Sequence, residues 1–370
     1  MRIGGQPGDR HAGGADADRR PRSGMGVDPA FVFAREGATW ASRDVRHRPV
    51  LLSSQPATHS RTSRVVGTTV SVLASHGRRS LKAPYGREAA LAGTAHGILV
   101  GYDGSPGSEK ALSWAAREAR AREAVLTVCQ AWALGYPAPP TEVAAFDLAR
   151  RSGEQTLARG LRHARAVMGS LEVRPLLAAG PAAAALCERS AGAEMVVVGS
   201  RGCGGLAGLL LGSVSSQVAA HARGRVVVVR GHWRPAAGYV PGPVVVGADG
   251  SAVSQAAVTF AAEEAALREA VLLAVCALAD SAGSLGGAHL LEEDFRQAIA
   301  RCEKEHPEVT VHPHVADGAA RAALLTAGYD AQMLVVGSRG RGGVRGMMLG
   351  SVSQAVLHHA ACPVGVVHPQ

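Results

Sequence analysis

The chain has 370 residues, of which 47% are hydrophobic, so it is long enough for two ordinary domains with sizeable cores. Its net charge of +9 is local, because residues 1–95 hold 15 Lys and Arg against 7 Asp and Glu, whereas residues 96–370 hold 24 against 23. This near-neutral remainder disfavours nucleic-acid binding, and we expect neither a secretion signal nor a membrane span.

Residues 1–95 differ in composition from the remainder of the chain. They are rich in Gly, Arg and Asp, and their few apolar stretches are isolated between polar ones. Such a segment buries too little apolar surface to offset the entropy cost of ordering it. We expect a disordered basic N-terminal extension; the alternative is a basic arm that binds nucleic acid or a partner.

From residue 97 onward, short apolar runs alternate with helical patterns. The apolar runs predict strands within 97–105, 124–132, 171–180, 194–200 and 225–230, and the helical patterns cover 108–123, 141–168, 181–193 and 213–224. The strand segments are continuously apolar, which is typical of strands buried on both faces of a parallel sheet. Strands that alternate with helices predict a doubly wound α/β sheet with right-handed crossovers.

The same order of elements then recurs. Strands are predicted within 244–251, 270–279, 309–318, 332–338 and 363–368, and helices within 254–269, 289–305, 319–328 and 351–360. The sequence therefore predicts a tandem duplication. Its domains are 96–232 and 243–370, joined by a Pro- and Gly-rich linker at 233–242.

A glycine-rich loop follows the fourth strand of each repeat, reading GSRGCGGLAGLLLGSVS from Gly199 and GSRGRGGVRGMMLGSVS from Gly337. Its glycines permit close backbone approach to a ligand and positive φ, and each Gly-Ser opens a helix whose first amides attract anions. Ser hydroxyls and an Arg guanidinium would add donors, so we predict phosphate binding; the alternative is a structural turn. The candidate residues are Gly199, Ser200, Arg201, Gly202, Gly204, Gly205, Gly212, Ser213, Val214 and Ser215, and Gly337, Ser338, Arg339, Gly340, Gly342, Gly343, Gly350, Ser351, Val352 and Ser353.

An aspartate ends the first strand of each repeat, Asp103 in GYDGS and Asp249 in GADGS. In a doubly wound sheet the first and fourth strands are neighbours at the switch point, so each aspartate should lie opposite a glycine loop. There it could accept hydrogen bonds from ribose hydroxyls or a base. The alternative is an aspartate that caps the following turn or helix.

With these aspartates, the pattern G-x-x-G-x₉-G-S makes residues 96–232 and 243–370 resemble the universal stress protein family, in its tandem ATP-binding form common in actinobacteria. The resemblance implies two adenine-nucleotide alpha-hydrolase-like domains, each with a five-stranded parallel sheet flanked by helices and one nucleotide. It implies phosphates on the loop and Gly-Ser, the aspartate near the ribose or base, and a small residue, Ala131 or Ala277, beside the adenine. It also implies that the fifth strands pair, in a homodimer or within one chain.

Three functions remain open at this stage. The first is an ATP-binding regulator of a stress or dormancy response, with or without Mg²⁺ and acting on an unknown protein partner. The second is a nucleotide-free interaction module, and the third is a slow ATP-hydrolysing enzyme. Neither glycine loop contains a Lys, which disfavours a Walker-type ATPase, so we expect no catalytic residues. Six scattered cysteines without metal-ligand spacing suit free thiols in a cytoplasmic protein without a metal site.

Overall fold

The computed structural model of the chain describes residues 96–133, 143–204, 210–230, 242–278, 285–341 and 348–369. We call residues 96–230 the first repeat and residues 242–369 the second repeat. The predicted N-terminal extension and nearly all of the predicted linker lie outside the described residues, as do Gly205, Gly342 and Gly343. Among the described helices, none has the length and apolar character needed to cross a membrane.

The first repeat alternates strands and helices. Its elements are β1 (Gly97–Gly101), α2 (Pro106–Arg122), β2 (Leu126–Trp132), α3 (Val143–Met168), β3 (Val173–Ala179), α4 (Ala182–Arg189), the 3₁₀ turn η2 (Ser190–Gly192), β4 (Ala193–Gly199), α5 (Ser213–His221) and β5 (Arg225–Val229). Helix α2 begins where the Ser105 side chain accepts a hydrogen bond from the Ser108 amide, with Pro106 at its first position. It ends at Glu123, which adopts the left-handed conformation.

The second repeat follows the same order. Its elements are β6 (Val244–Gly247), α6 (Ala252–Leu267), β7 (Leu272–Ala277), α7 (Leu285–Glu305), β8 (Val311–Ala316), α8 (Ala320–Ala327), β9 (Met333–Gly337), α9 (Ser351–His359) and β10 (Val364–Val367). The Ser251 side chain caps α6 as Ser105 caps α2, because it accepts a hydrogen bond from the Ser254 amide.

The strands form one sheet in the order β3-β2-β1-β4-β5-β10-β9-β6-β7-β8. The strands within each repeat are parallel, which confirms the predicted α/β class with two five-stranded parallel halves. Strands β5 and β10 pair antiparallel, with Val227 opposite Gly365. The fifth strands therefore join within one chain, so that neither presents a free edge there.

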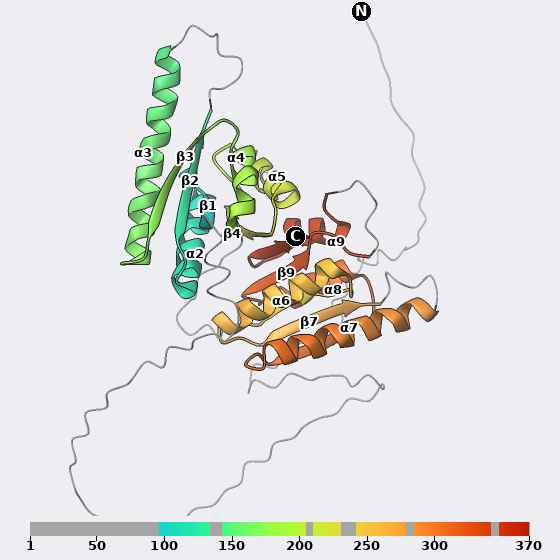
Figure 1. Ribbon diagram of the computed structural model, residues 1–370. Coiled ribbons are helices and arrows are strands. Elements are labelled where there is room, and N and C mark those ends of the chain that lie inside the picture. Colours follow the sequence, from blue (N-terminus) through green and yellow to red (C-terminus); the bar gives the residue numbers. More distant parts are fainter. Residues whose placement is uncertain are drawn as a thin grey trace, which may run out of the picture. The chain divides into compact units, whose positions relative to one another are not determined.

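Helices cover both faces of the sheet (Figure 1). Successive strand residues point to opposite faces, since Val100 belongs to the same buried cluster as Leu112 of α2, whereas Leu99 belongs to a second cluster with Leu186 of α4. Helices α2, α3, α6 and α7 contribute to the first core layer, and α4, α5, α8 and α9 contribute to the second. Burial on both faces holds for the central strands only; the outermost strands β3 and β8 are largely half-buried, because each has a neighbour on one side.

Candidate functional site

Each predicted aspartate closes a link between the first strand and the glycine loop. Asp103 Oδ1 accepts a hydrogen bond from the Ser105 amide at 2.9 Å, and its Oδ2 accepts one from the Cys203 amide of the loop at 3.0 Å. Asp249 repeats this arrangement with the amides of Ser251, at 3.0 Å, and Arg341, at 2.8 Å. One carboxylate thus caps its own turn and holds a loop about a hundred residues further along the chain.

These hydrogen bonds set the ionisation of both aspartates. Burial raises the pKa of Asp103, but the hydrogen bonds from Ser105 and the Cys203 amide outweigh it and hold the pKa below its ordinary value. Burial is likewise outweighed at Asp249 by hydrogen bonds from Ser251 and the Arg341 amide, which lower its pKa. Both carboxylates are therefore charged at neutral pH and strengthen the contacts that hold the loops.

Three of the described loop glycines, Gly199, Gly202 and Gly340, are required by packing against the residues that follow the first strand of their repeat, and none of them has positive φ. A Cβ at Gly199 would lie 2.5 Å from the backbone of Gly107, and one at Gly202 would lie 2.5 Å from Asp103 Oδ2. Gly340 faces Asp249 in the same way. Glycine permits positive φ, but Gly199, Gly202 and Gly204 do not adopt it in this structure. A side chain at Gly199, Gly202 or Gly340 would push the glycine loop away from the residues that follow the first strand.

The helix that follows each loop begins without a capping side chain. The N-cap of α5 is Gly212 and that of α9 is Gly350, and neither has a side-chain cap hydrogen bond. The N-cap amides are held instead by the loop, since Gly212 donates to the Ser200 carbonyl at 2.7 Å and Gly350 to the Ser338 carbonyl at 2.8 Å. The first-turn amides that follow carry the positive end of the helix dipole.

The two serines of each Gly-Ser-Val-Ser stretch have different environments. Ser213 and Ser351 are exposed, whereas Ser215 and Ser353 are buried. The Ser215 hydroxyl lies 3.0 Å from both the Ser200 and the Gly212 carbonyls, to which it can only donate. Because a hydroxyl carries one proton, Ser215 here donates within its own loop, and its role as a donor to a ligand stays a prediction. Ser353 likewise donates within its own loop, to the Gly337 carbonyl at 2.7 Å.

The remaining candidates lie around this framework. Arg201 and Arg339 are exposed, and their Cα atoms lie 3.4 Å and 3.6 Å from the Cβ positions of the N-cap glycines Gly212 and Gly350. Val214 is exposed and Val352 is half-buried in the first turns of α5 and α9. Ala131 and Ala277 are half-buried at the carboxyl ends of β2 and β7, next to the strands that lead to the aspartates.

The sequence analysis missed one charged side chain beside each site. In the first repeat, Arg159 of α3 faces Gly104, with its Nη2 2.7 Å from a Cβ placed there. In the second repeat, Asp294 of α7 faces Gly250 and forms an ion pair with Arg341 of the loop. Arg159 and Asp294 lie inside long amphipathic helices, so nothing local in the sequence marks them.

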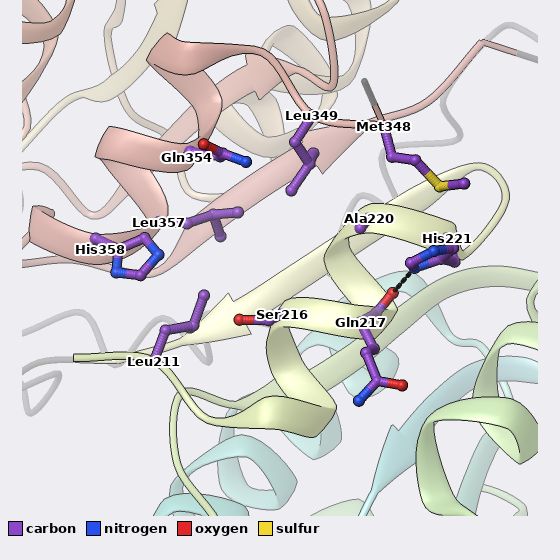
Figure 2. A pocket seen from close by; sticks show the side chains of 10 residues that line it. All are labelled: Leu211, Ser216, Gln217, Ala220, His221, Met348, Leu349, Gln354, Leu357 and His358. Carbon is purple, nitrogen blue, oxygen red and sulfur yellow. Dashed lines mark hydrogen bonds between the residues drawn. The ribbon is translucent and has the colours of Figure 1, made fainter. Parts of the chain in front are cut away.

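A separate cavity of about 370 Å³ lies between α5 and α9. Figure 2 shows its lining side chains, which come from these helices and from the residues just before them. They are Leu211, Ser216, Gln217, Ala220, His221, Met348, Leu349, Gln354, Leu357 and His358. None of the predicted site residues lines this cavity, although Leu211 and Leu349 directly precede the N-cap glycines.

The fold and the two sites define a tandem pair of doubly wound α/β domains, each with a Gly-Ser loop held by a strand-end aspartate. The family model described as "Universal stress protein family" matches residues 95–230 and 242–368. The chain belongs to the universal stress protein family.

Similar proteins agree with this assignment. A universal stress protein of Mycolicibacterium smegmatis is 35% identical over 290 residues, covering 75% of this chain and 98% of that protein. Universal stress protein Rv1996 of Mycobacterium tuberculosis is 36% identical over 298 residues, covering 72% and 93%. The crystal structure of a universal stress protein from Archaeoglobus fulgidus has the same fold, with a TM-score of 0.59 and 21% identity over 74% of this chain and 98% of that chain.

Proposed function

We propose that each repeat binds one adenine nucleotide, ATP with or without Mg²⁺, and that occupancy regulates conformation or partner choice in a stress or dormancy response. The observation that carries this proposal is the contrast between helix starts. Serine side chains cap α2 and α6, whereas α5 and α9 begin at glycines without a side-chain cap. Uncapped first-turn amides beside a glycine loop suit a phosphate group.

The nucleotide would lie along the switch-point edge of each half-sheet. Phosphates would contact the first-turn amides at Ser213 and Val214, with the Arg201 guanidinium able to reach them. Each Asp103 oxygen accepts one amide hydrogen bond and retains a lone pair for a ribose hydroxyl or a base. Ala131 leaves room for a flat ring beside β1. The second repeat offers Ser351, Val352, Arg339, Asp249 and Ala277 for the same roles.

Magnesium would enter with the phosphates. The described residues contain no group of three or more His, Cys, Asp or Glu placed to hold a metal ion. Phosphate oxygens and water would therefore supply most of its coordination, which is the usual mode for Mg²⁺ bound with a nucleotide.

We propose a binding role in preference to a catalytic one, because neither glycine loop contains a Walker-type Lys. The alternatives are a nucleotide-free interaction module and a slow ATPase. Denaturing the purified protein and identifying released nucleotide by mass spectrometry separates them. About two ATP per chain supports both sites, and ADP that accumulates with time supports slow hydrolysis. No nucleotide, with no heat of ATP binding in calorimetry, favours the interaction module.

The helix start can be tested by paired substitutions at Gly350. Its Cβ position is open, with the nearest atom 3.6 Å away and no positive φ, so Gly350→Ala should fold and bind normally. Gly350→Glu places a carboxylate beside the first-turn amides and should abolish binding in the second repeat, which halves the nucleotide content. Equal content in both variants would overturn the site assignment, provided that circular dichroism shows both to be folded.

A further inference from the structure

A buried cluster of charges lies beneath the β5–β10 junction, where the carboxyl-terminal turns of α2 and α6 meet. Glu118 and Arg122 at the end of α2 correspond by repeat position to Glu264 and Arg268 of α6. Both glutamates are almost fully buried, at 4% and 0% exposure. These four residues, which we call the symmetric quartet, occupy equivalent positions in the two repeats.

Ion pairs cross between the repeats in both directions. Arg122 contacts Glu118 at 2.6 Å within α2 and also forms an ion pair with Glu264 of α6. Arg268 contacts Glu264 at 2.5 Å and reaches Glu118 at 2.7 Å. Because its members have the same identity in both repeats, the symmetric quartet would form equally well between two copies of either repeat.

Glu263 breaks this symmetry. Arg225, the first residue of β5, holds Glu263 in a bidentate pair, with Nη1 to Oε2 at 2.6 Å and Nη2 to Oε1 at 2.8 Å. The Arg122 guanidinium lies 3.7 Å from the same carboxylate. Two guanidiniums of the first repeat therefore converge on one carboxylate of the second; the Arg122 side chain is 9% exposed, and those of Arg225 and Glu263 are half-buried.

The repeat equivalents of these residues carry different charges. Arg117 of α2 stands where α6 has Glu263, and Pro363 stands where the first repeat has Arg225. The sheet register confirms this last correspondence, because Val226 pairs with Val196 as Val364 pairs with Leu334. Neither half of the bidentate pair therefore has a like-charged equivalent in the other repeat.

Pairing between two identical repeats would therefore be unfavourable, both for two first repeats and for two second repeats. Two first repeats would bring Arg117 against Arg225 and Arg122, so that three guanidiniums converge where Glu263 is missing, with only Glu194 beside Arg122 at 2.7 Å. Two second repeats would place Glu263 opposite Pro363, which leaves a half-buried carboxylate without its bidentate partner. Both combinations lose favourable charge contacts, whereas the unlike pairing gives Glu263 both Arg225 and Arg122.

We propose that Glu263, held by Arg225 and Arg122, is the specificity determinant that makes a first repeat pair with a second repeat and not with another first repeat. Without it, the charges at the junction would favour no combination of repeats over another. The symmetric quartet contributes to the junction without choosing the partner. The junction therefore keeps the two repeats together as one unit with two non-identical sites.

The test is a charge exchange in the full-length chain. The exchange variant combines Arg117→Glu with Glu263→Arg. When a first repeat pairs with a second repeat, the new Arg at position 263 faces Arg225 and repels it. When two first repeats pair, the new Glu at position 117 faces Arg225 and complements its charge. We expect light scattering after gel filtration to give about twice the mass of the unaltered chain. Arg117→Glu alone is the matched control, because it keeps Glu263, and its mass should equal that of the unaltered chain.

A second set of variants tests the proposal even if the exchange variant does not fold. Glu263→Arg alone should lower the thermal midpoint by about 5 °C, because a half-buried bidentate ion pair becomes a repulsion between guanidiniums. Arg225→Glu combined with Glu263→Arg should recover most of that loss, since the bidentate pair is restored in reverse. If the exchange variant keeps the mass and thermal midpoint of the unaltered chain, or if the reversed pair gives no recovery, the proposal is overturned.

Discussion

Glu118 and Glu264, one from each repeat, share the same two guanidiniums beneath the β5–β10 junction, because Arg122 and Arg268 each form ion pairs with both carboxylates. Two carboxylates that share a buried site repel each other, which disfavours the ionisation of one of them. Burial, followed by the charge of Glu118, raises the pKa of Glu264 to about 7, whereas the guanidiniums of Arg268 and Arg122 outweigh burial at Glu118 and lower its pKa. Glu264 is therefore the carboxylate of the two that takes up a proton as pH falls through about 7, and it is the charged partner of both guanidiniums above that pH.

This proton makes the stability of the fold depend on pH. Because the pKa of Glu264 rises from 4.5 to about 7 on folding, its contribution is complete below 4.5 and is lost as pH rises through 7. We expect the thermal midpoint of the unaltered chain to fall, relative to that of Glu264→Gln, between pH 5 and pH 8, by several degrees. Differential scanning fluorimetry across that range measures the difference.

The comparison with Glu264→Gln is needed because buried histidines change the stability of the fold with pH in the opposite direction. Burial lowers the pKa of His314 and of His368, and each then stabilises the fold as pH rises through the ordinary histidine range. Both histidines are present in both chains, so their effect cancels in the difference. Parallel pH profiles of the two chains would show that Glu264 does not bind the proton.

A second prediction concerns the strand-end aspartates. Asp103→Asn keeps the shape of the side chain but removes the charge that strengthens hydrogen bonds from the Ser105 and Cys203 amides. We expect a loss of about 1 kcal/mol in the free energy of unfolding and roughly a tenfold weaker affinity for ATP in the first repeat. Urea denaturation and calorimetry measure the two effects.

The aspartate effect also has a defined pH dependence. The folded pKa of Asp103 is lowered, so its contribution is present above the ordinary value of 3.8 and is lost as pH falls through the folded pKa. The Asp103→Asn chain should therefore lose less stability than the unaltered chain on acidification below pH 4. An equal loss would contradict the role of the carboxylate in holding the loop.

A third prediction distinguishes two glycines of one loop. Gly202→Ala places a Cβ 2.5 Å from Asp103 Oδ2 and must displace the loop, whereas Gly204→Ala meets no atom within 4 Å and needs no positive φ. We expect Gly202→Ala to cost about 1–3 kcal/mol and to weaken nucleotide binding, with Gly204→Ala close to neutral. Similar effects of both substitutions would mean that the glycines serve a ligand contact that they share.

A fourth prediction concerns the centre of the junction, where Val227 of β5 lies opposite Gly365 of β10. A Cβ at Gly365 would lie 2.7 Å from Met333 Cε and 3.1 Å from the Phe260 ring. Gly365→Val should therefore destabilise the chain by about 1–3 kcal/mol through overpacking. Met333→Ala in the same chain provides space and should recover part of the loss in urea denaturation; no recovery would place the cost elsewhere.

Much of the fold could be predicted from sequence because its signals are local. Continuous apolar runs marked the central strands, and the duplicated order of elements showed that the architecture occurs twice. The Gly-Ser stretch marked the start of α5 and of α9, since glycine at an N-cap leaves a recognisable pattern. The edge strands β3 and β8 were predicted in position, but their half-burial depends on the order of strands in the sheet, which no single segment encodes.

The roles within the site were less predictable because they depend on contacts between distant segments. Asp103 and Gly202 were each singled out, but their mutual contact sets the loop and decides why a glycine is required there. Ser215 was predicted to donate to a ligand, and only the positions of the Ser200 and Gly212 carbonyls show that its hydroxyl has acceptors within the loop.

The sequence by itself determined the duplicated α/β architecture, the loop and the family, because periodicity, turn chemistry and repeated motifs are properties of short segments. Only the tertiary structure decided how the repeats join. In the sequence, Glu118 and Glu264 are charged residues of amphipathic helices, and such residues normally face water. They are buried because the β5–β10 pairing brings the ends of α2 and α6 together. Each charge can be buried there because an arginine of the other repeat forms an ion pair with it.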